Sequence, residues 1–426
     1  MKLNYKRTIL VGFAFFLISA FWQAYDTIVP LILTNKFDMG QTYSGIIMSL
    51  DNIFAVVLLP IFGTLSDKTM TKFGKRTPYI TIGTIFAAIF LVILGFVSNL
   101  VGFILILLVC LLSMATFRSP AVALMPDVTV KPLRSKGNAI INLMGTAGGM
   151  LVLGLSIFLK TNTPGKTDFS AYLIVVSVVM IGALVAFLLT VKEPLWSSEA
   201  EAENAKLDEE KEKEAEKEKV VGNISRSEFI SLILILASVA LWYIGYNAVT
   251  SKYSVYATEV LNVPYNVTLL VAQGAAIVSY IPVGIVASKI GRKKTILAGV
   301  AMLTMAFLLA SFIKAGTNPI VMYLLFCLAG IGWATINVNS FPMVVELAKG
   351  GDVGKYTGFY YTASMAAQIV TPIFSGFLID KIGWWIFFPY AAFFAGCAFI
   401  TMFFVKHGDA KPEVQGALES LGGADD

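Results

Sequence analysis

The sequence predicts an all-α membrane protein in which twelve transmembrane helices form two six-helix halves. Of its 426 residues, 57% are hydrophobic and only 14% are charged, and the mean hydropathy is +0.77. A soluble domain has about 25% charged residues, so this composition excludes a soluble globular protein, a disordered chain and a nucleic-acid-binding protein. Twelve apolar stretches and an uneven distribution of Lys and Arg are the two further observations behind the prediction.

The apolar stretches are long enough to cross a bilayer, whose hydrocarbon core of about 30 Å requires roughly 20 residues of helix. The first stretch follows a basic N-terminus, as in a signal peptide, but it stays apolar over about 25 residues and lacks a small-residue cleavage pattern. It is therefore predicted to be the first span. The twelve predicted spans are 8–33, 43–65, 79–98, 101–125, 137–160, 170–191, 228–258, 264–288, 295–313, 319–345, 355–379 and 384–405.

The positive charges predict that both termini lie in the cytoplasm. The loops on that side carry most of the 32 Lys and Arg residues. The opposite side holds only Lys36, Lys160, Lys166, Lys252, Lys314 and Lys381. Lys252 is expected to extend its ammonium group to the membrane interface. We therefore expect a multi-pass protein of the cell (inner or plasma) membrane.

A charged segment divides the chain. Between Glu199 and Lys219 there are ten acidic residues and five lysines, a pattern typical of a solvated, helix-prone linker. The predicted organisation is an N-terminal six-helix half (1–196), a cytoplasmic linker (197–227), a C-terminal six-helix half (228–406) and a cytoplasmic tail (407–426).

The two halves have matching sequence features. The loops GTLSDKTMTKFGKRTPYI (63–80) and GIVASKIGRKKTI (284–296) both begin with Gly and end with Gly followed by basic residues. Aligning WQAYD (22–26) with WYIGYN (242–247) sets Asp26 against Asn247, and aligning Asp127 with Glu346 sets Arg118 against Asn337. Repeated halves joined by a central linker are typical of secondary transporters, which bind their substrate near the bilayer midplane.

Three ionisable residues lie inside predicted spans, where each costs about 2.5–3.5 kcal/mol or more. Asp26 and Asp51 share a depth of roughly 10–12 Å from the outer face, at about 1.5 Å per residue. A carboxylate that is poorly solvated, or that has a carboxylate neighbour, takes up a proton near neutral pH. Both are therefore candidates for a proton or cation site, although either could instead be a structural hydrogen-bond anchor or an acid at a water-filled outer vestibule.

Arg118 cannot be neutralised, so it must pair with a carboxylate or face water. It could hold Asp26 or Asp51, bind a hydroxylated substrate, or pair with Asp127. Aromatic rings and amides suit a sugar, because rings stack on its C–H face and amides bind its hydroxyls, although such residues also pack helices together. The candidate substrate-binding residues are Arg118, Trp22, Tyr25, Trp242, Tyr246, Asn247, Asn337 and Gln368.

The 63–80 loop carries a specific resemblance. Its pattern is matched by Pro60, Gly63, Ser66, Asp67, Gly74, Lys75, Arg76, Pro78, Tyr79 and Ile80. In this pattern the chain resembles the glycoside–pentoside–hexuronide:cation symporters of the major facilitator superfamily, above all the sucrose transporters and their bacterial and animal relatives. The resemblance implies the major facilitator fold. The gate residues, which should latch one conformational state rather than bind substrate, are Gly63, Asp67, Gly74, Lys75, Arg76, Gly291 and Arg292.

The sequence departs from that resemblance at two places. Melibiose-type sodium symporters carry two Asp residues at the positions of Ala55 and Leu59, so that sodium site is absent, which favours H⁺ over Na⁺. The sucrose transporters have an Arg at the position of Val122, whereas here Arg118 lies one helical turn earlier on the same face.

These observations predict a secondary active transporter that imports an α-glucoside such as sucrose or maltose with a cation, by alternating access. The alternatives are an exporter of amphipathic drugs or lipid-like solutes and a non-transporting sugar sensor. No ATP-binding motif, nucleophile triad or metal cluster is found in the sequence, so no enzyme activity and no cofactor besides the coupling ion are expected. The expected partners are the sugar and the lipid bilayer, with no nucleic acid, and the chain is expected to be a monomer.

Overall fold

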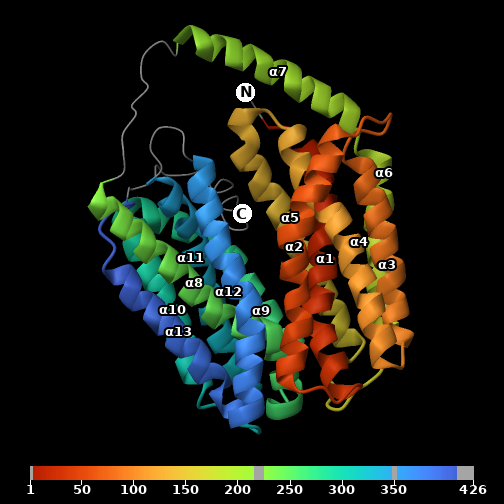
Figure 1. The fold of residues 1–426 in the computed structure, drawn as a ribbon, viewed down its shortest axis with the longest axis vertical. Helices are drawn as coiled ribbons and strands as arrows, with labels where there is room; N and C mark the ends of the chain where they lie inside the picture. Colours follow the sequence, from red (N-terminus) through yellow and green to blue (C-terminus); the bar gives the residue numbers. More distant parts are fainter. Residues whose placement is uncertain (1–2, 215–224, 348–352, 410–426) are drawn as a thin grey trace. The chain divides into compact units, whose positions relative to one another are not determined.

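The computed structural model describes residues 3–214, 225–347 and 353–409, and all regular secondary structure in these ranges is helical. Within the described residues, twelve helices are long and apolar enough to cross a membrane, the number that the sequence predicts. Figure 1 shows these long helices and one further helix, α7, that runs transverse to the helices before it.

The helices before the linker are α1 (Tyr5–Asn35), α2 (Gln41–Lys68), α3 (Thr77–Phe96), α4 (Leu100–Asp127), α5 (Arg134–Phe158) and α6 (Ser170–Thr190), with a 3₁₀ turn, η1 (Lys131–Leu133), before α5. The transverse helix α7 (Glu193–Glu214) follows α6. The remaining helices are α8 (Arg226–Val255), α9 (Tyr265–Ile290), α10 (Arg292–Ala310), α11 (Pro319–Val345), α12 (Val353–Ile382) and α13 (Phe387–Phe403).

Local sequence signals set several helix starts. The side chains of Asn99 and Asn318 accept hydrogen bonds from the first turns of α4 and α11. Ser225 and Glu228 form a capping box at the start of α8. These side chains satisfy backbone N–H groups that have no partner within the helix.

Two compact units are defined by contacts within the chain. Unit 1 comprises residues 1–25, 53–152 and 168–219, and unit 2 comprises 26–52, 153–167 and 220–426. The predicted halves follow the sequence repeat, whereas these units follow packing. The second part of α1 and the first part of α2 therefore belong to unit 2 together with the C-terminal helices.

Within unit 1, α3 packs against α4 and α6. Within unit 2, α11 packs against α9 and α10, and α8 packs against α12 and α13. The helix α8 continues into a π-helical segment, η2 (Tyr256–Leu261), which ends at Asn262 with a left-handed φ of 56°. Such π segments are rare and are found frequently at functional sites.

The linker region is only partly as predicted. Helix α7 begins at Glu193, before the predicted boundary, and one of its faces is covered: Trp196 is 7% exposed and Ala200 is 4% exposed. This face is therefore packed rather than solvated. Residues 215–224 of the predicted linker and 410–426 of the predicted tail lie outside the described residues.

Glycines allow the closest helix contacts, as expected for membrane helices. A Cβ built on Gly148 of α5 would lie 2.6 Å from the carbonyl oxygen of Phe16 on α1. One built on Gly330 of α11 would lie 2.2 Å from the carbonyl oxygen of Ala272 on α9. At these positions any side chain would push the helices apart.

We predict that Gly330→Ala lowers the thermal unfolding temperature of the detergent-purified protein, because overpacking costs about 1–3 kcal/mol. Gly182→Ala is the matched control, since its Cβ would meet nothing within 4 Å and Ala favours helix by about 1 kcal/mol over Gly. Scanning fluorimetry should show opposite shifts for the two variants. A shift of the same sign and size in both would contradict this account of α9–α11 packing.

Candidate functional site

Arg76 joins the ends of three helices in unit 1. Its Nε donates a hydrogen bond of 2.7 Å to Asp127 at the end of α4, and its Nη atoms bind Ser66 and Asp67 at the end of α2. Burial lowers the pKa of Arg76, but its hydrogen bonds and charge interactions with Asp127 and Asp67 outweigh burial, and the net shift is upward. The guanidinium therefore stays charged and holds α2, α3 and α4 together.

Glu193 of α7 caps the N-terminus of α3. Its carboxylate is buried and accepts backbone N–H bonds from Lys75 (2.8 Å), Arg76 (2.8 Å) and Thr77 (2.7 Å), and a 2.7 Å bond from the Thr77 hydroxyl. A negative charge is stabilised at a helix N-terminus by free N–H groups and by the helix dipole.

Gly74 makes room for that carboxylate. Its φ is +111°, and a Cβ there would lie 2.3 Å from the carboxyl carbon of Glu193. Both the backbone conformation and the space therefore require glycine. At Gly63 the restriction is weaker: a Cβ would lie 2.9 Å from the Ser119 hydroxyl, which would have to shift.

The second half repeats the arrangement in unit 2. Gly291 has a φ of +93°, and Arg292 pairs with Glu346 at 2.7 Å. Asp409, which follows α13, accepts the backbone N–H of Lys293 at 2.8 Å, and a Cβ on Gly291 would lie 2.7 Å from it. The helices α3 and α10, which follow the 63–80 and 284–296 loops, thus both start beside a glycine with a positive φ. Each is capped by an acid from the segment that follows the sixth span of its half.

The candidate coupling carboxylates both belong to unit 2. Asp26 on α1 and Asp51 on α2 are half-buried. Asp51 accepts hydrogen bonds from the backbone N–H and the side chain of its neighbour Asn52, at 2.5 and 2.8 Å. Both carboxylates lie in helix interiors rather than at helix starts.

Arg118 lies among aromatic rings in unit 1. Its guanidinium is 5.3 Å from the ring centroid of Trp22, in cation–π geometry. Trp22 in turn contacts Tyr25 edge to face, with centroids 5.3 Å apart. The sequence-predicted Arg118, Trp22 and Tyr25 therefore form one cluster, although Tyr25 is only 1% exposed.

A second aromatic cluster lies in unit 2. Tyr246 of α8 stacks on Trp333 of α11 with centroids 3.5 Å apart, and Tyr243 meets the same indole edge to face at 5.3 Å. The amide of Asn247 donates to the Tyr243 carbonyl oxygen at 2.9 Å. Trp333 was not among the sequence candidates, and it lies outside the aligned segments 22–26 and 242–247.

The other predicted binding residues differ in exposure. Gln368 of α12 is half-buried, Asn337 of α11 is 8% exposed, and Trp242 of α8 is 0% exposed. Trp242 therefore packs inside unit 2 and offers no surface to a ligand in this structure.

The expectation for Lys252 is wrong. Its side chain is not exposed, as extension to the membrane interface would require: the residue is 1% exposed, and Nζ donates to the carbonyl oxygen of Gln41 at 2.9 Å. Hydropathy patterns cannot reveal this contact, because it joins residues far apart in the sequence.

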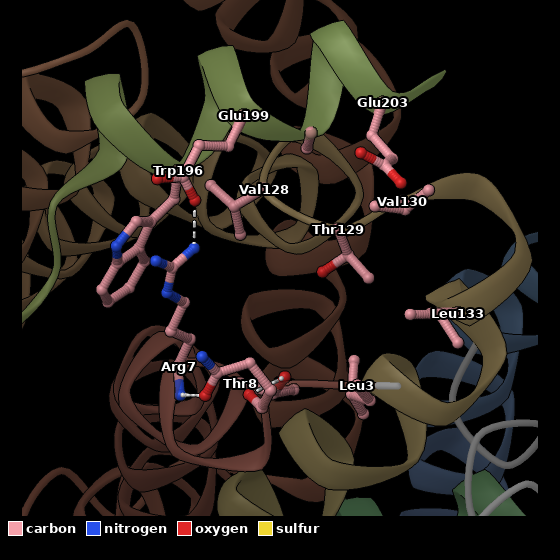
Figure 2. Close-up of a pocket in the computed structure, with 12 residues that line it drawn as sticks. Leu3, Arg7, Thr8, Val128, Thr129, Val130, Leu133, Trp196, Glu199 and Glu203 are labelled. Carbon is pink, nitrogen blue, oxygen red and sulfur yellow. Dashed lines mark hydrogen bonds and ion pairs between the residues drawn. The ribbon is translucent and has the colours of Figure 1, made fainter. Parts of the chain in front are cut away.

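A cavity of about 390 Å³ lies beneath α7 in unit 1 (Figure 2). Arg7 lines it, pairs with Glu199 and lies 5.2 Å from the Trp196 ring centroid. Together with the 2.8 Å bond from the Lys131 N–H to Asn204, these contacts hold α7 against the start of α1 and the 128–133 segment. Sequence reasoning missed this attachment and the caps by Glu193 and Asp409, although an acid shortly after the sixth span of each half was a usable signal.

Solved structures show which class of protein has this fold. The chain matches a mutant of the nucleoside transporter NupG with a TM-score of 0.68 at 13% identity, covering 93% of this chain and 98% of that one. It matches a mutant of the peptide transporter POT with a TM-score of 0.69 at 13% identity, covering 94% and 93%. The chain therefore has the same fold as these membrane transporters, which confirms the predicted fold class.

Residues 10–354 match the family described as MFS/sugar transport protein, and the chain belongs to this family, which comprises transporters rather than enzymes. It is 23% identical over 378 residues to an uncharacterized MFS-type transporter of Methanocaldococcus jannaschii, covering 88% of both chains. It is 27% identical over 147 residues to the sucrose transport protein SUC3 of Arabidopsis thaliana, covering 29% of this chain and 24% of that one.

We predict that Glu193→Ala destabilises the protein by roughly 1.5–3 kcal/mol, the range for hydrogen bonds to a charged group. The reason is that three backbone N–H groups at the start of α3 lose their acceptor. Thermal unfolding in detergent measures the effect. Glu201→Ala is the control, since that side chain is 68% exposed and 3.9 Å from Lys75; an equal loss in both variants would refute the capping role.

Proposed function

We propose that this chain is a cation-coupled sugar symporter that imports an α-glucoside such as sucrose or maltose by alternating access, with H⁺ as the coupling ion. The observation that carries the proposal is the match of residues 10–354 to a family of sugar transport proteins. The partial similarity to a sucrose transport protein supports the disaccharide assignment.

The two aromatic clusters support a sugar as substrate. A sugar presents an apolar C–H face and a rim of hydroxyl groups, which aromatic rings and charged or amide groups recognise. The Trp22–Arg118 pair supplies an aromatic ring beside a charged guanidinium donor. In the Tyr246–Trp333 pair, Tyr246 is followed directly in the sequence by Asn247, whose side chain carries an amide. We assign sugar contacts to these residues and leave out the buried Trp242.

The half-buried carboxylates support cation coupling. Asp26 and Asp51 lie within helices long and apolar enough to cross the membrane, where a fixed negative charge is costly. Because uptake of a proton neutralises a carboxylate and removes that cost, these two groups are our candidates for carrying the coupling ion. We place the protein in the cell membrane with both termini in the cytoplasm, which follows from its charge distribution.

The proposal is tested with the purified full-length protein in liposomes that contain a pH-sensitive dye. Mono- and disaccharides are added one at a time without sodium. One disaccharide should acidify the lumen, and Asp26→Asn should abolish this signal because the amide cannot take up a proton. Asp38→Asn is the matched control: it removes the same charge from the exposed 36–40 loop and should transport normally.

Two results would contradict the proposal. Acidification that survives in Asp26→Asn would remove Asp26 as the coupling group and direct attention to Asp51. Silence across the whole panel, repeated with sodium and radiolabelled sugars, would overturn sugar symport. In that case, transport of an amphipathic solute that lipophilic cations inhibit and sugars do not would favour an exporter of amphipathic solutes.

A further inference from the structure

The first turn of α2 is held in unit 2 by a carboxylate from α12. Asp380 accepts the backbone N–H groups of Gln41 and Thr42, both at 2.7 Å, and the Thr42 hydroxyl at 2.6 Å. These N–H groups lie at a helix N-terminus, where a carboxylate makes strong, charge-assisted hydrogen bonds. Asp380 therefore fastens a helix of the first sequence half to a helix of the second.

Lys252 of α8 holds the same turn with the opposite charge. Its buried ammonium donates to the Gln41 carbonyl oxygen at 2.9 Å, so both backbone groups of Gln41 are bound by C-terminal side chains. Lys252 and Asp380 also attract one another electrostatically. Only Lys252 is buried, and the nearby negative charge of the exposed Asp380 lowers the cost of burying its ammonium group.

Glycines bring the two backbones into contact at this turn. A Cβ on Gly45 of α2 would lie 2.0 Å from the Pro372 carbonyl oxygen, and a Cβ on Gly376 of α12 would lie 2.1 Å from the Gln41 carbonyl oxygen. The two helices therefore approach closely at these glycines, and a side chain at either position would push them apart.

A second set of contacts also joins the first sequence half to the second. Glu259, in the π-helical η2, accepts a 2.7 Å bond from the Asn35 side chain and a 3.0 Å bond from the Gly165 N–H. Tyr265 and Thr161 share a 2.6 Å hydrogen bond between hydroxyls. All these residues lie toward the helix ends on the side of the 36–40 loop.

We propose that these contacts form a reversible latch that closes the transport path on the side of the 36–40 loop, with Asp380 as its main holding group. When α2 moves away, water can satisfy its backbone groups, and Asp380 and Lys252 can pair with each other. Both charged groups thus keep a partner of opposite charge when they release α2. The Arg76 contacts, by comparison, join helices of one sequence half.

The latch rests on the proposed alternating-access function, but its test needs no substrate. Spin labels are placed at Asp38→Cys and Ala315→Cys in the full chain, with Cys110, Cys327 and Cys397 replaced by Ala. Both label positions are exposed and lie on the 36–40 side, one in each sequence half. Double electron–electron resonance then gives the distribution of distances between them.

Asp380→Ala should raise the ratio of the long-distance to the short-distance population about tenfold or more, since it removes three charge-assisted hydrogen bonds. Lys381→Ala, at the exposed neighbouring residue, should leave the distribution unchanged. Gly376→Val should shift it in the same direction as Asp380→Ala without altering any charge, because the added side chain blocks the approach of α2.

Unchanged distances in both Asp380→Ala and Gly376→Val would overturn the latch. If Asp380→Ala does not fold, Thr42→Val removes only the hydroxyl contact, and a smaller shift in the same direction supports the proposal while no shift overturns it. A distance shift in a protein that transports no sugar would leave the latch standing and reject only the proposed substrate.

Discussion

Much of this structure depends on one interaction: a carboxylate accepts hydrogen bonds from the first backbone N–H groups of a helix. Glu193 at α3 and Asp409 at α10 both make it, each beside an arginine that binds the acid ending the fourth span of its half. In both cases the helix starts beside a glycine with a positive φ. The dipole and free N–H groups of the helix stabilise the charge, and glycine supplies both the backbone conformation and the space. Together these contacts fix where the helices of each half end.

In the part of the chain that the structure describes, the arginine after the glycine is paired with more acids in the first half than in the second. Arg76 binds Asp67 and Asp127, whereas in the second half Ser288 stands where Asp67 would be matched and bonds to its own helix backbone. The first half is also braced by α7, which carries Glu193 and contacts Arg7. A segment that looks like a solvated linker in the sequence is therefore, over its first turns, part of the N-terminal half.

Two groups of acids in this membrane protein differ in their position within a helix. Glu193, Asp380 and Asp409 accept hydrogen bonds from backbone N–H groups at helix starts, which have no partner within the helix. Asp26 and Asp51 lie in helix interiors. We propose coupling for the second group, because uptake of a proton removes the cost of a negative charge inside a membrane span.

The sequence by itself determined the number of spans, their approximate bounds and the family, because hydropathy over about 20 residues and the Gly–basic loop pattern are local properties. It also named Arg118, Trp22 and Tyr25 as candidates for one site, and helix periodicity brings Trp22 and Tyr25 together. Only the tertiary structure decided that Lys252 is buried, that Trp333 stacks on Tyr246, and that Glu193 and Asp380 cap helices far away in the chain. These contacts join residues separated by tens to hundreds of positions, and a single sequence carries no local signal of which distant helix end will meet a given charge.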